Sequence, residues 1–594
     1  MSRSVRHVPV SDASSEVAAA AGSAVDSTSA EPVAPVMTHR QVLEALSGLL
    51  LGMFVSILAT TVVSTSLPRI ISDLNGDQTA FTWVVTSTLL ATTVSTPIWG
   101  KLADIFNRKV LIQLSLVLFV VGSGLAGFSQ DTSTLILFRV FQGLGAGGLT
   151  ALSQIIMADI ISPRERGRYM GLFGAVMAVG TVSGPLIGGL LTDTVGWRWN
   201  FFVGVPFAII AIILLQLTLR LPKSPKRKVR IDYLGAVLLT GGVSLLLIWI
   251  TMAGSQFEWA SWTTVYMVGG AAFLLIATVV TELRAKEPII PLEMFKNRSF
   301  TLAVIASISV GVAMFGTTVF LSQYMQLARG ATATQSGLLT LPMIGGMLVS
   351  STIVGGLITR FGKWKAFMVA GSVMLTVGIY LMSTVEYNTD YLLLSVYMLL
   401  LGAGIGMVMQ NLVLVVQNAV APNLLATASS SVAFFRSLGG TIGVSIMGSV
   451  LAATVTSMMV DQKAEIVKAV MALGAKGAPI AEAMQAGTLP KVSTLPLSLR
   501  TIIEAIYGQA VADIFLIAVP LAIITVVAIL LLPNKKLGTK TTLERLAEQE
   551  RDAQEYIQDA EEVVVDVAEA MLGGVRFADE DAQALPEAKA QRSS

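Results

Sequence analysis

The chain has 594 residues, of which 54% are hydrophobic and only 13% are charged, whereas soluble globular proteins carry about 25% charged residues. This composition predicts an integral membrane protein. The net charge of +2 gives no reason to expect a nucleic-acid partner, and the absence of cysteine excludes disulfides, iron–sulfur clusters and thiol chemistry.

The first region, residues 1–42, is rich in serine, alanine and valine and has no long apolar run. We therefore expect a disordered cytoplasmic tail without a cleavable signal. The two histidines of the chain, His7 and His39, both lie in this tail. A histidine metal site inside the membrane is excluded, and neither a metal nor another cofactor is expected.

Long apolar stretches follow one another through most of the remaining chain. A helix that spans a bilayer needs roughly 20 apolar residues. By this measure we predict an all-α integral membrane protein with fourteen spanning helices, near residues 43–66, 80–98, 110–128, 134–157, 168–192, 200–220, 231–252, 263–283, 300–325, 335–358, 366–384, 391–416, 427–453 and 509–532.

Lysine and arginine are concentrated in alternate connections. One set of connections is nearly bare of them, whereas the other carries clusters such as Lys223–Arg230 and Arg360–Lys365. Connections rich in Lys and Arg stay in the cytoplasm. Both termini are therefore predicted to be cytoplasmic, in a multi-pass protein of the cell membrane.

Two parts of the chain resemble each other in register. At an offset of 255 residues, Gly100–Arg108 resembles Gly355–Lys363. At an offset of 259, Gly143, Gly145, Gly147, Asp159, Pro163, Gly180 and Gly184 are matched by Gly402, Gly404, Gly406, Asn418, Pro422, Gly439 and Gly443. Chance similarity hardly explains three such matches. Parallel repeats of this kind are how alternating-access carriers are built.

The repeat predicts the domain organisation. We expect an N-terminal six-helix half at 43–220, a two-helix insert with its flanking loops at 221–299, a C-terminal six-helix half at 300–532 and a partly helical cytoplasmic tail at 533–594. The external connection 454–508 is long and is predicted to contain an amphipathic helix near 460–473. In the tail, a capping box at Thr541 and Glu544 predicts an acidic helix that ends near residue 572.

The fifth span has glycines around a proline, and these residues are Gly180, Gly184, Pro185, Gly188 and Gly189. Glycine in a helix interior costs about 1 kcal/mol relative to alanine, and proline about 3. Membrane helices tolerate this where neighbours pack closely on the small residues. We expect a bent, closely crossed helix. The second half has Val444 in place of Pro185. Only the proline therefore remains a candidate for setting the direction of transport or for gating.

The loop between the second and third spans holds a charged motif that includes Gly100, Asp104, Arg108 and Lys109. A carboxylate beside an arginine and helix ends can hold two helices together in one state and release them in another. Positive-inside topology alone would explain Arg108 and Lys109 but not Asp104. We therefore favour a conformational latch.

The fourth span contains Arg139, followed by Gln142 and Gly143. An arginine within lipid is expected to face the bundle or water, because exposure to lipid costs several kcal/mol. The alternative is a structural arginine that reaches the nearby external surface, since this span begins only near Thr134.

Together, these three motifs resemble those of the major facilitator superfamily, and in particular its fourteen-span drug:proton antiporter family (EmrB/QacA-like), over residues 43–532. The resemblance implies that Asp104 and Arg108 form the latch and that Arg139 takes part in proton transfer. It also implies that the glycine–proline motif of the fifth span belongs to an exporter.

The chain departs from the family pattern in the loop and in the first span. Ile105 stands where arginine is usual, and Asn107 where glycine is usual. Asparagine tolerates a positive φ, so the turn remains possible. The first span reads Leu58–Ser64 without the embedded aspartate that the related group commonly shows. No acidic residue lies near the middle of another predicted span, so the acid that would couple transport to protons is not identified.

The conspicuous charge within a span is Arg436, about nine residues (~13 Å) into span 13. Near a cavity it would favour anionic or neutral amphiphiles, and the alternative is a structural arginine that bonds helix carbonyls. Further candidates for the substrate cavity are Trp83, Gln323, Tyr324, Gln410, Asn411 and Phe434. Most apolar and aromatic residues of spanning helices face lipid or pack in the bundle.

We predict proton-driven efflux of small amphipathic compounds by rocking of the two halves within membrane lipid. One alternative is a lipid or glycolipid exporter, in which the connection 454–508 contacts a lipid or an external partner. A second is a non-transporting sensor with a carrier fold. An enzyme is not expected: the dinucleotide-like string Gly122–Gly127 lies within a predicted span, and no nucleophile–base pair or Walker A sequence is present.

Overall fold

The computed structural model describes residues 39–567, apart from gaps at 75–77, 220–231, 254–255, 286, 332, 473–494, 540–543, 546–547, 550 and 565–566. Most of the predicted tail 1–42 therefore lies outside the described residues. Its last residues, from His39 on, belong to the first described helix, so this helix begins before the predicted start of the first span.

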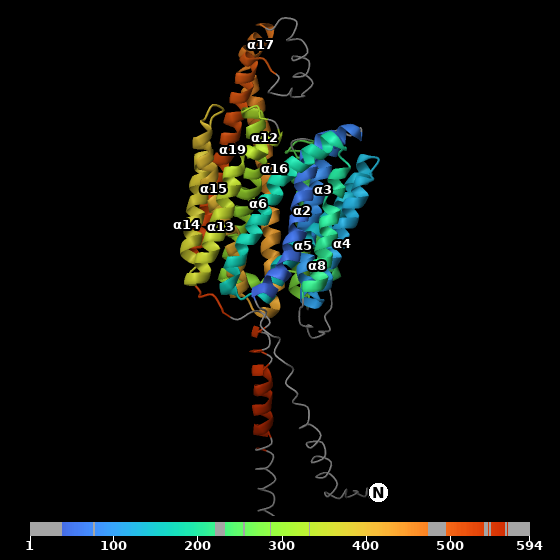
Figure 1. The fold of residues 1–594 in the computed structure, drawn as a ribbon, viewed down its shortest axis with the longest axis vertical. Helices are drawn as coiled ribbons and strands as arrows, with labels where there is room; N and C mark the ends of the chain where they lie inside the picture. The colour runs from blue at the N-terminus through green and yellow to red at the C-terminus, as the bar shows by residue number, and fades with distance from the viewer. Residues whose placement is uncertain are drawn as a thin grey trace, which may run out of the picture. The chain divides into compact units, whose positions relative to one another are not determined.

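The described chain is almost entirely helical (Figure 1). The first half and the insert contain α2 (His39–Asp73), α3 (Gln78–Ile105), α4 (Arg108–Gly127), α5 (Thr132–Ile160), α6 (Pro163–Thr194), α7 (Trp199–Phe202), α8 (Gly204–Thr218), α9 (Tyr233–Met252) and α10 (Trp262–Arg284). The second half contains η1 (Leu292–Lys296), α11 (Arg298–Gln323), η2 (Tyr324–Ala328), α12 (Ala333–Leu339), α13 (Leu341–Phe361), α14 (Lys365–Met382), α15 (Tyr391–Ala419), η3 (Pro422–Leu424), α16 (Leu425–Asp461), α17 (Lys463–Ala472) and α19 (Leu497–Leu531).

Among the described residues, 13 helical segments are long and apolar enough to cross a membrane. They match the predicted spans except for α3. This helix has 28 residues but is rich in serine and threonine, which lower its hydropathy. Because α3 packs between α5 and α16, it lies inside the bundle. The all-α membrane fold is confirmed, and the number of fourteen spans stays a prediction.

The two predicted halves meet along two pairs of helices. Helix α6 packs against α13, and α3 packs against α16 (Figure 1). In the insert, α10 packs on α9, and α9 contacts both α3 and α16. The insert therefore lies beside one of the two seams between the halves.

The repeat in the sequence is also a repeat in the packing. In α5, Gly143 and Gly147 face α3 and Gly145 faces α4; in α15, Gly402 and Gly406 face α13 and Gly404 faces α14. At each of these positions an added Cβ would come too close to an atom of the facing helix. Small residues at such crossings let helix backbones approach closely.

Three glycines of the span-5 motif, Gly180, Gly184 and Gly188, lie against α2. Thr61 donates to the Gly180 carbonyl at 3.2 Å, and Ser66 donates to the Gly188 carbonyl at 3.3 Å. In the second half, the matching glycines Gly439 and Gly443 lie against α11 in the same way. The backbone of α6 is helical throughout the motif, whereas the side chain of Pro185 lies outside the described residues.

Asn107 does not adopt the positive φ that the loop motif suggested for this position. Its φ is −62°, so the turn does not use the left-handed region. Instead its side chain accepts a hydrogen bond from the Lys109 backbone N–H at 2.9 Å and caps α4. Asparagine is a favoured N-cap because its side chain satisfies a free N–H of the first turn.

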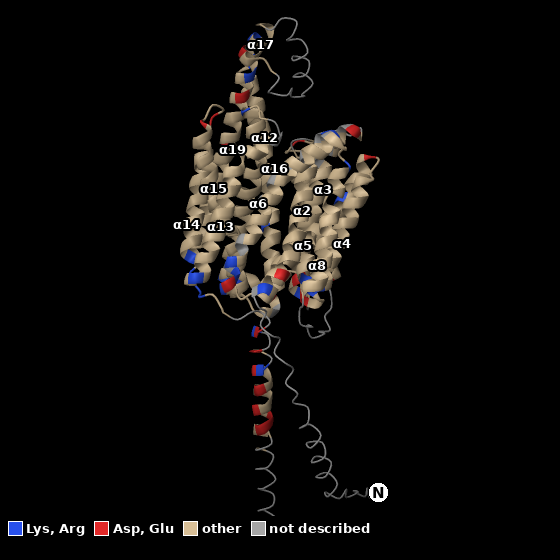
Figure 2. Ribbon diagram, viewed as in Figure 1, with Lys and Arg blue, Asp and Glu red and all other residues tan. Residues whose placement is uncertain are grey.

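Three helices extend into the predicted external connection 454–508. Helix α16 has 37 residues and α19 has 35, which exceeds the roughly 20 that a bilayer requires. Helix α17 covers most of the predicted amphipathic helix and lies beyond the other described helices (Figure 1). In the C-terminal tail, residues 551–564 are helical, exposed and rich in acidic side chains (Figure 2).

Close packing at Gly122 gives a test of the bundle. A Cβ at this position would lie 2.5 Å from the backbone nitrogen of Gln142, whereas a Cβ at Gly124 would have no neighbour within 4 Å. We expect Gly122→Ala to lower the free energy of unfolding by about 1–3 kcal/mol, because α4 and α5 must move apart. Gly124→Ala, in the same helix, should be neutral or slightly stabilising.

Thermal unfolding of the two purified variants in detergent would measure this difference. Equal melting temperatures would show that α4 and α5 do not approach each other as described.

Candidate gate and transport residues

The two halves are joined at one end of the bundle, the predicted cytoplasmic face. Here Gly100 near the end of α3 lies directly against Ser430 of α16, and a Cβ at Gly100 would overlap the serine hydroxyl. The first glycine of the loop motif is therefore needed for contact between the halves. We call this set of contacts between the halves, together with the side chains that support them, the gate.

Asp104, in the last turn of α3, bonds across the same seam. The hydroxyl of Thr427, in the first turn of α16, donates to the Asp104 carboxylate. This contact places a carboxylate at a helix N-terminus, where the helix dipole favours negative charge. Asp104 lies beyond the predicted end of its span at residue 98, and burial raises the pKa of its carboxyl to about 6.

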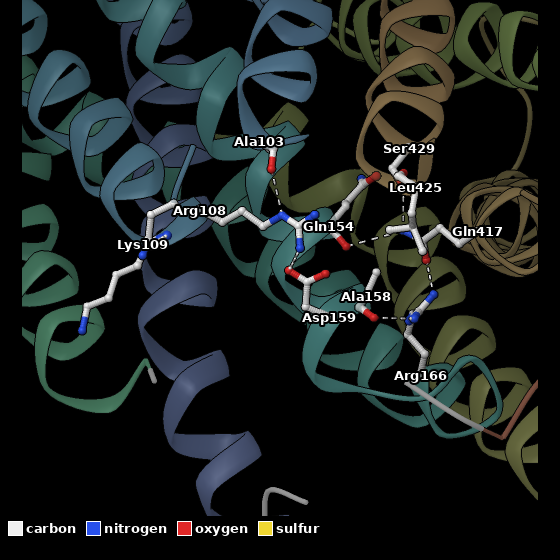
Figure 3. A network of polar contacts seen from close by, with 11 residues as sticks. Ala103, Arg108, Lys109, Gln154, Ala158, Asp159, Arg166, Gln417, Leu425 and Ser429 are labelled. Atoms are coloured by element: carbon white, nitrogen blue, oxygen red, sulfur yellow. Dashed lines mark hydrogen bonds and ion pairs between the residues drawn. The ribbon is translucent and has the colours of Figure 1, made fainter. Parts of the chain in front are cut away.

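Arg108 pairs with a residue that the loop motif does not contain. Its guanidinium bonds the carboxylate of Asp159 in α5 at 2.5 Å and the Ala103 carbonyl at 3.0 Å (Figure 3). Lys109 points away from this pair, and its ammonium donates to the Gln216 carbonyl at 2.8 Å. In the described state, Asp104 and Arg108 therefore act on different helices and do not bond each other.

Unlike Arg108, the buried Arg166 bonds across the seam between the halves. Arg166, at the start of α6, is completely buried and donates to the side chain of Gln417 in α15 (Figure 3). It also donates to the carbonyls of Ala158 and Ile161 at 3.1 and 2.9 Å. Arg166 lies before the apolar part of α6, and burial lowers the pKa of its guanidinium to about 9. The Asp159 carboxylate opposes this shift.

Gln417 extends the network in the opposite direction. Its amide nitrogen donates to the Ser429 hydroxyl at 2.9 Å and to the Gln154 carbonyl at 3.5 Å (Figure 3). It thus contacts α5 and α6 of the first half and α16 of the second. The motifs of the sequence include neither Arg166 nor Gln417, since Arg166 lies in a connection rich in arginine and does not stand out there. The one available signal for Gln417 was its position beside the repeat residue Asn418.

An ion pair links the end of the insert to α3, the helix that carries Gly100 and Asp104 of the gate. Lys101 of α3 bonds Glu287 at 2.9 Å, in the connection that follows α10. Lys101 is buried, and its exposed side-chain fraction is only 9%. Since this connection leads into α11, the pair links the first half to the part of the chain that enters the second half.

Arg139 lies in the interior of the first half. It is 2% exposed, and its guanidinium donates to the Val84 carbonyl at 3.2 Å and to the Gln142 side chain at 2.7 Å. Gln142 in turn donates to the Ser123 hydroxyl at 3.1 Å. The alternative in which Arg139 reaches the external surface is therefore wrong. The described residues offer this arginine no carboxylate partner.

Arg436 is buried in α16, with 5% of the residue exposed. One of its terminal nitrogens, Nη1, has no hydrogen-bond partner among the described residues. The backbone carbonyl of Arg436 lies against Gly311 of α11. A buried guanidinium with a free donor is unusual, because such groups normally find an acceptor.

The other cavity candidates differ in their surroundings. Within the described part of the chain, the side-chain oxygens of Gln410 and Gln323 have no hydrogen-bond partner. Asn411 donates to the Met407 carbonyl of its own helix at 2.6 Å, and the buried ring of Phe434 packs edge-on to that of Phe435. Trp83 is partly exposed.

Tyr324 is engaged at the opposite end of the bundle. Its hydroxyl donates to the Glu386 carbonyl at 2.6 Å, in the connection between α14 and α15. This contact ties the helical turn that follows α11 to the connection between α14 and α15, which is predicted to be external.

Comparison with known proteins agrees with this architecture. The family model described as Major Facilitator Superfamily matches residues 49–444. An uncharacterized MFS-type transporter of Mycobacterium tuberculosis is 36% identical over 82% of this chain and 69% of its own length. Multidrug resistance protein 3 of Bacillus subtilis is 32% identical over 84% of this chain and 97% of its own length.

A solved structure shows the same fold. The proton:xylose symporter XylE matches 86% of this chain and 99% of its own chain with a TM-score of 0.54. At 14% sequence identity, this likeness concerns the fold alone.

The Arg108–Asp159 pair gives a test of the gate. Arg108→Ala would leave the Asp159 carboxylate buried without its partner, and such a loss costs about 3–5 kcal/mol. Asp159→Asn in the same chain should restore part of the stability, because the buried charge is removed. Lys109→Ala, one residue away, should cost less than about 1 kcal/mol, since it removes a single bond to a carbonyl.

Thermal unfolding of the three single variants and the double variant gives the coupling between the two positions. If the double variant were no more stable than Arg108→Ala, then Asp159 would not be the group that Arg108 neutralises.

Proposed function

Because the chain belongs to the major facilitator superfamily, we propose that it is a secondary active exporter of small amphipathic compounds, driven by proton entry. The observation that carries this proposal is the gate, where α3, α5 and α6 of the first half meet α15 and α16 of the second at one end of the bundle. Carriers of this architecture work by opening the two ends in turn. The names of relatives, among them multidrug resistance protein 3, support compound efflux.

The gate residues suggest how the two ends alternate. Thr427 and Gln417 belong to the second half, and their partners Asp104 and Arg166 belong to the first. Rocking the halves apart at the predicted cytoplasmic face would break these bonds and expose the groups to water. Arg108 and Asp159 lie within the first half and would move together. In this scheme they support the gate and are not its moving contact.

Arg436 supports a preference for anionic or neutral compounds. Its free Nη1 donor could bind a carboxylate, sulfate or phosphate group, and an organic cation would be repelled by the same charge. The unpartnered oxygen of Gln410 offers an acceptor to a hydroxyl or protonated group. Arg139 and Gln142 remain the candidates for the proton path.

The lipid or glycolipid exporter remains the second candidate. The observation that favours it is the length of α16 and α19, which together with α17 extend the second half beyond the span predicted for it. Such an extension could receive a lipid or an external partner protein.

A flux measurement tests the proposed function. The full-length protein is reconstituted in liposomes under an imposed proton gradient, and internal pH is followed while amphipathic compounds are added. We expect proton movement that depends on the compound, because antiport links the two fluxes. Binding without proton movement would instead indicate a sensor, and lipid-dependent proton movement would indicate the lipid exporter.

The substrate preference is tested at Arg436. Arg436→Ala should reduce transport of anionic compounds by about tenfold or more, because a charge-assisted hydrogen bond is lost. Arg436→Lys should retain part of the transport, and neutral compounds should be affected least. If Arg436→Ala left the transport of every anionic compound intact, Arg436 would be a structural residue only.

A further inference from the structure

The segment that follows α19 is fastened to the second half. We call residues 533–538 the strap. Its Lys535 carbonyl accepts a hydrogen bond from the indole of Trp364 at 2.8 Å. Just before the strap, the Leu532 carbonyl accepts from the Lys365 ammonium at 2.7 Å, and within it the side chain of Leu537 is buried. The strap is thus held against the predicted cytoplasmic face.

Asn418, at the end of α15, binds the strap with both ends of its amide. The amide nitrogen donates to the Lys536 carbonyl at 3.0 Å, and the amide oxygen accepts from the Gly538 N–H at 2.9 Å. A carboxylate at this position could accept the second bond but could not donate the first.

Gly538 bonds both halves of the protein. Its N–H is held by Asn418 of the second half, whereas its carbonyl accepts from the backbone N–H of Arg164 at 3.2 Å. Arg164 lies in the first turn of α6, in the first half, where backbone N–H groups have no partner within the helix. One residue of the strap therefore closes a chain of hydrogen bonds between the halves.

The internal repeat relates this contact to one in the first half. Asn418 is the counterpart of Asp159, whose carboxylate holds Arg108 in the first half. The second half has an amide in place of the carboxylate, and the amide holds the backbone of the strap. The two halves thus use the same helix position to fasten different segments at the same face.

We propose that the strap is a cytoplasmic restraint that holds the gate closed, with Asn418 as its positioning residue. Its bond to Arg164 must break before the halves can separate at this face. The bonds involved are between neutral groups, and each contributes only about 1 kcal/mol net. The restraint is therefore weak enough to release in every cycle. The inference rests on the proposed alternation of the two ends.

The test uses the absence of cysteine from the chain. Ser430, which is completely buried in α16 directly against Gly100 of the other half, is replaced by cysteine as the only thiol. Inside-out membrane vesicles expose the predicted cytoplasmic face, and the rate of labelling by a membrane-impermeant maleimide reports how often the gate opens. Gly100→Ala serves as a positive control, because its methyl group wedges α3 away from the side chain at position 430.

Two pairs of variants test the strap in the full-length protein. Gly538→Pro removes the N–H that Asn418 accepts, whereas Gly538→Ala keeps it, since the added Cβ would lie 3.5 Å from the Asn418 oxygen. Asn418→Ala removes both side-chain bonds, whereas Asn418→Asp keeps the acceptor. We expect about fivefold faster labelling in Gly538→Pro and Asn418→Ala, and a rate near that of the parent in Gly538→Ala.

The outcomes separate this inference from the proposed function. Unchanged labelling in both Gly538→Pro and Asn418→Ala, together with faster labelling in Gly100→Ala, would overturn the strap and leave the gate standing. If Gly100→Ala also labelled at the parental rate, both the strap and the gate would be refuted. Because the two strap variants alter different segments, failure of one to fold leaves the other to decide.

Discussion

A charged side chain that is buried in a packed helix bundle needs a partner within the protein, because water does not reach it. This requirement organises the gate. The guanidinium of Arg166 is completely buried. Its hydrogen-bond acceptors are backbone carbonyls of its own half and the side chain of Gln417 in the other half. When this end of the bundle is closed, Gln417 of the second half supplies one of the acceptors that the Arg166 guanidinium needs.

The same requirement sets Arg436 apart. Both terminal nitrogens of Arg166 find acceptors and only its Nε has none, whereas the terminal nitrogen Nη1 of Arg436 has no partner among the described residues. Closely packed helices surround it, since its backbone carbonyl lies against Gly311. The helices are in close contact at this point, but the Nη1 donor of Arg436 has no acceptor among the described residues.

Much of the architecture could be predicted from the sequence, because hydropathy and glycine spacing report directly on helices that cross lipid and pack closely. The offset of 259 residues predicted that Gly402 corresponds to Gly143. In the structure both glycines lie at a close crossing of two helices. The gate was predicted only in part. The motif identified Asp104 and Arg108, but their partners Thr427 and Asp159 lie far away in the sequence and carry no local signal. Pairings across helices depend on the tertiary packing.

The position of the insert makes the protein unequal on its two sides. Helix α9 packs against both α3 and α16, and the buried pair of Lys101 and Glu287 fastens the end of the insert to the same place. At the seam between α6 and α13, the short helix α12 contacts both. Along one seam, lipid is therefore displaced by two helices of spanning length, and along the other by a helix of seven residues. The two halves are built alike, but the surfaces that the protein presents to lipid along the two seams are not.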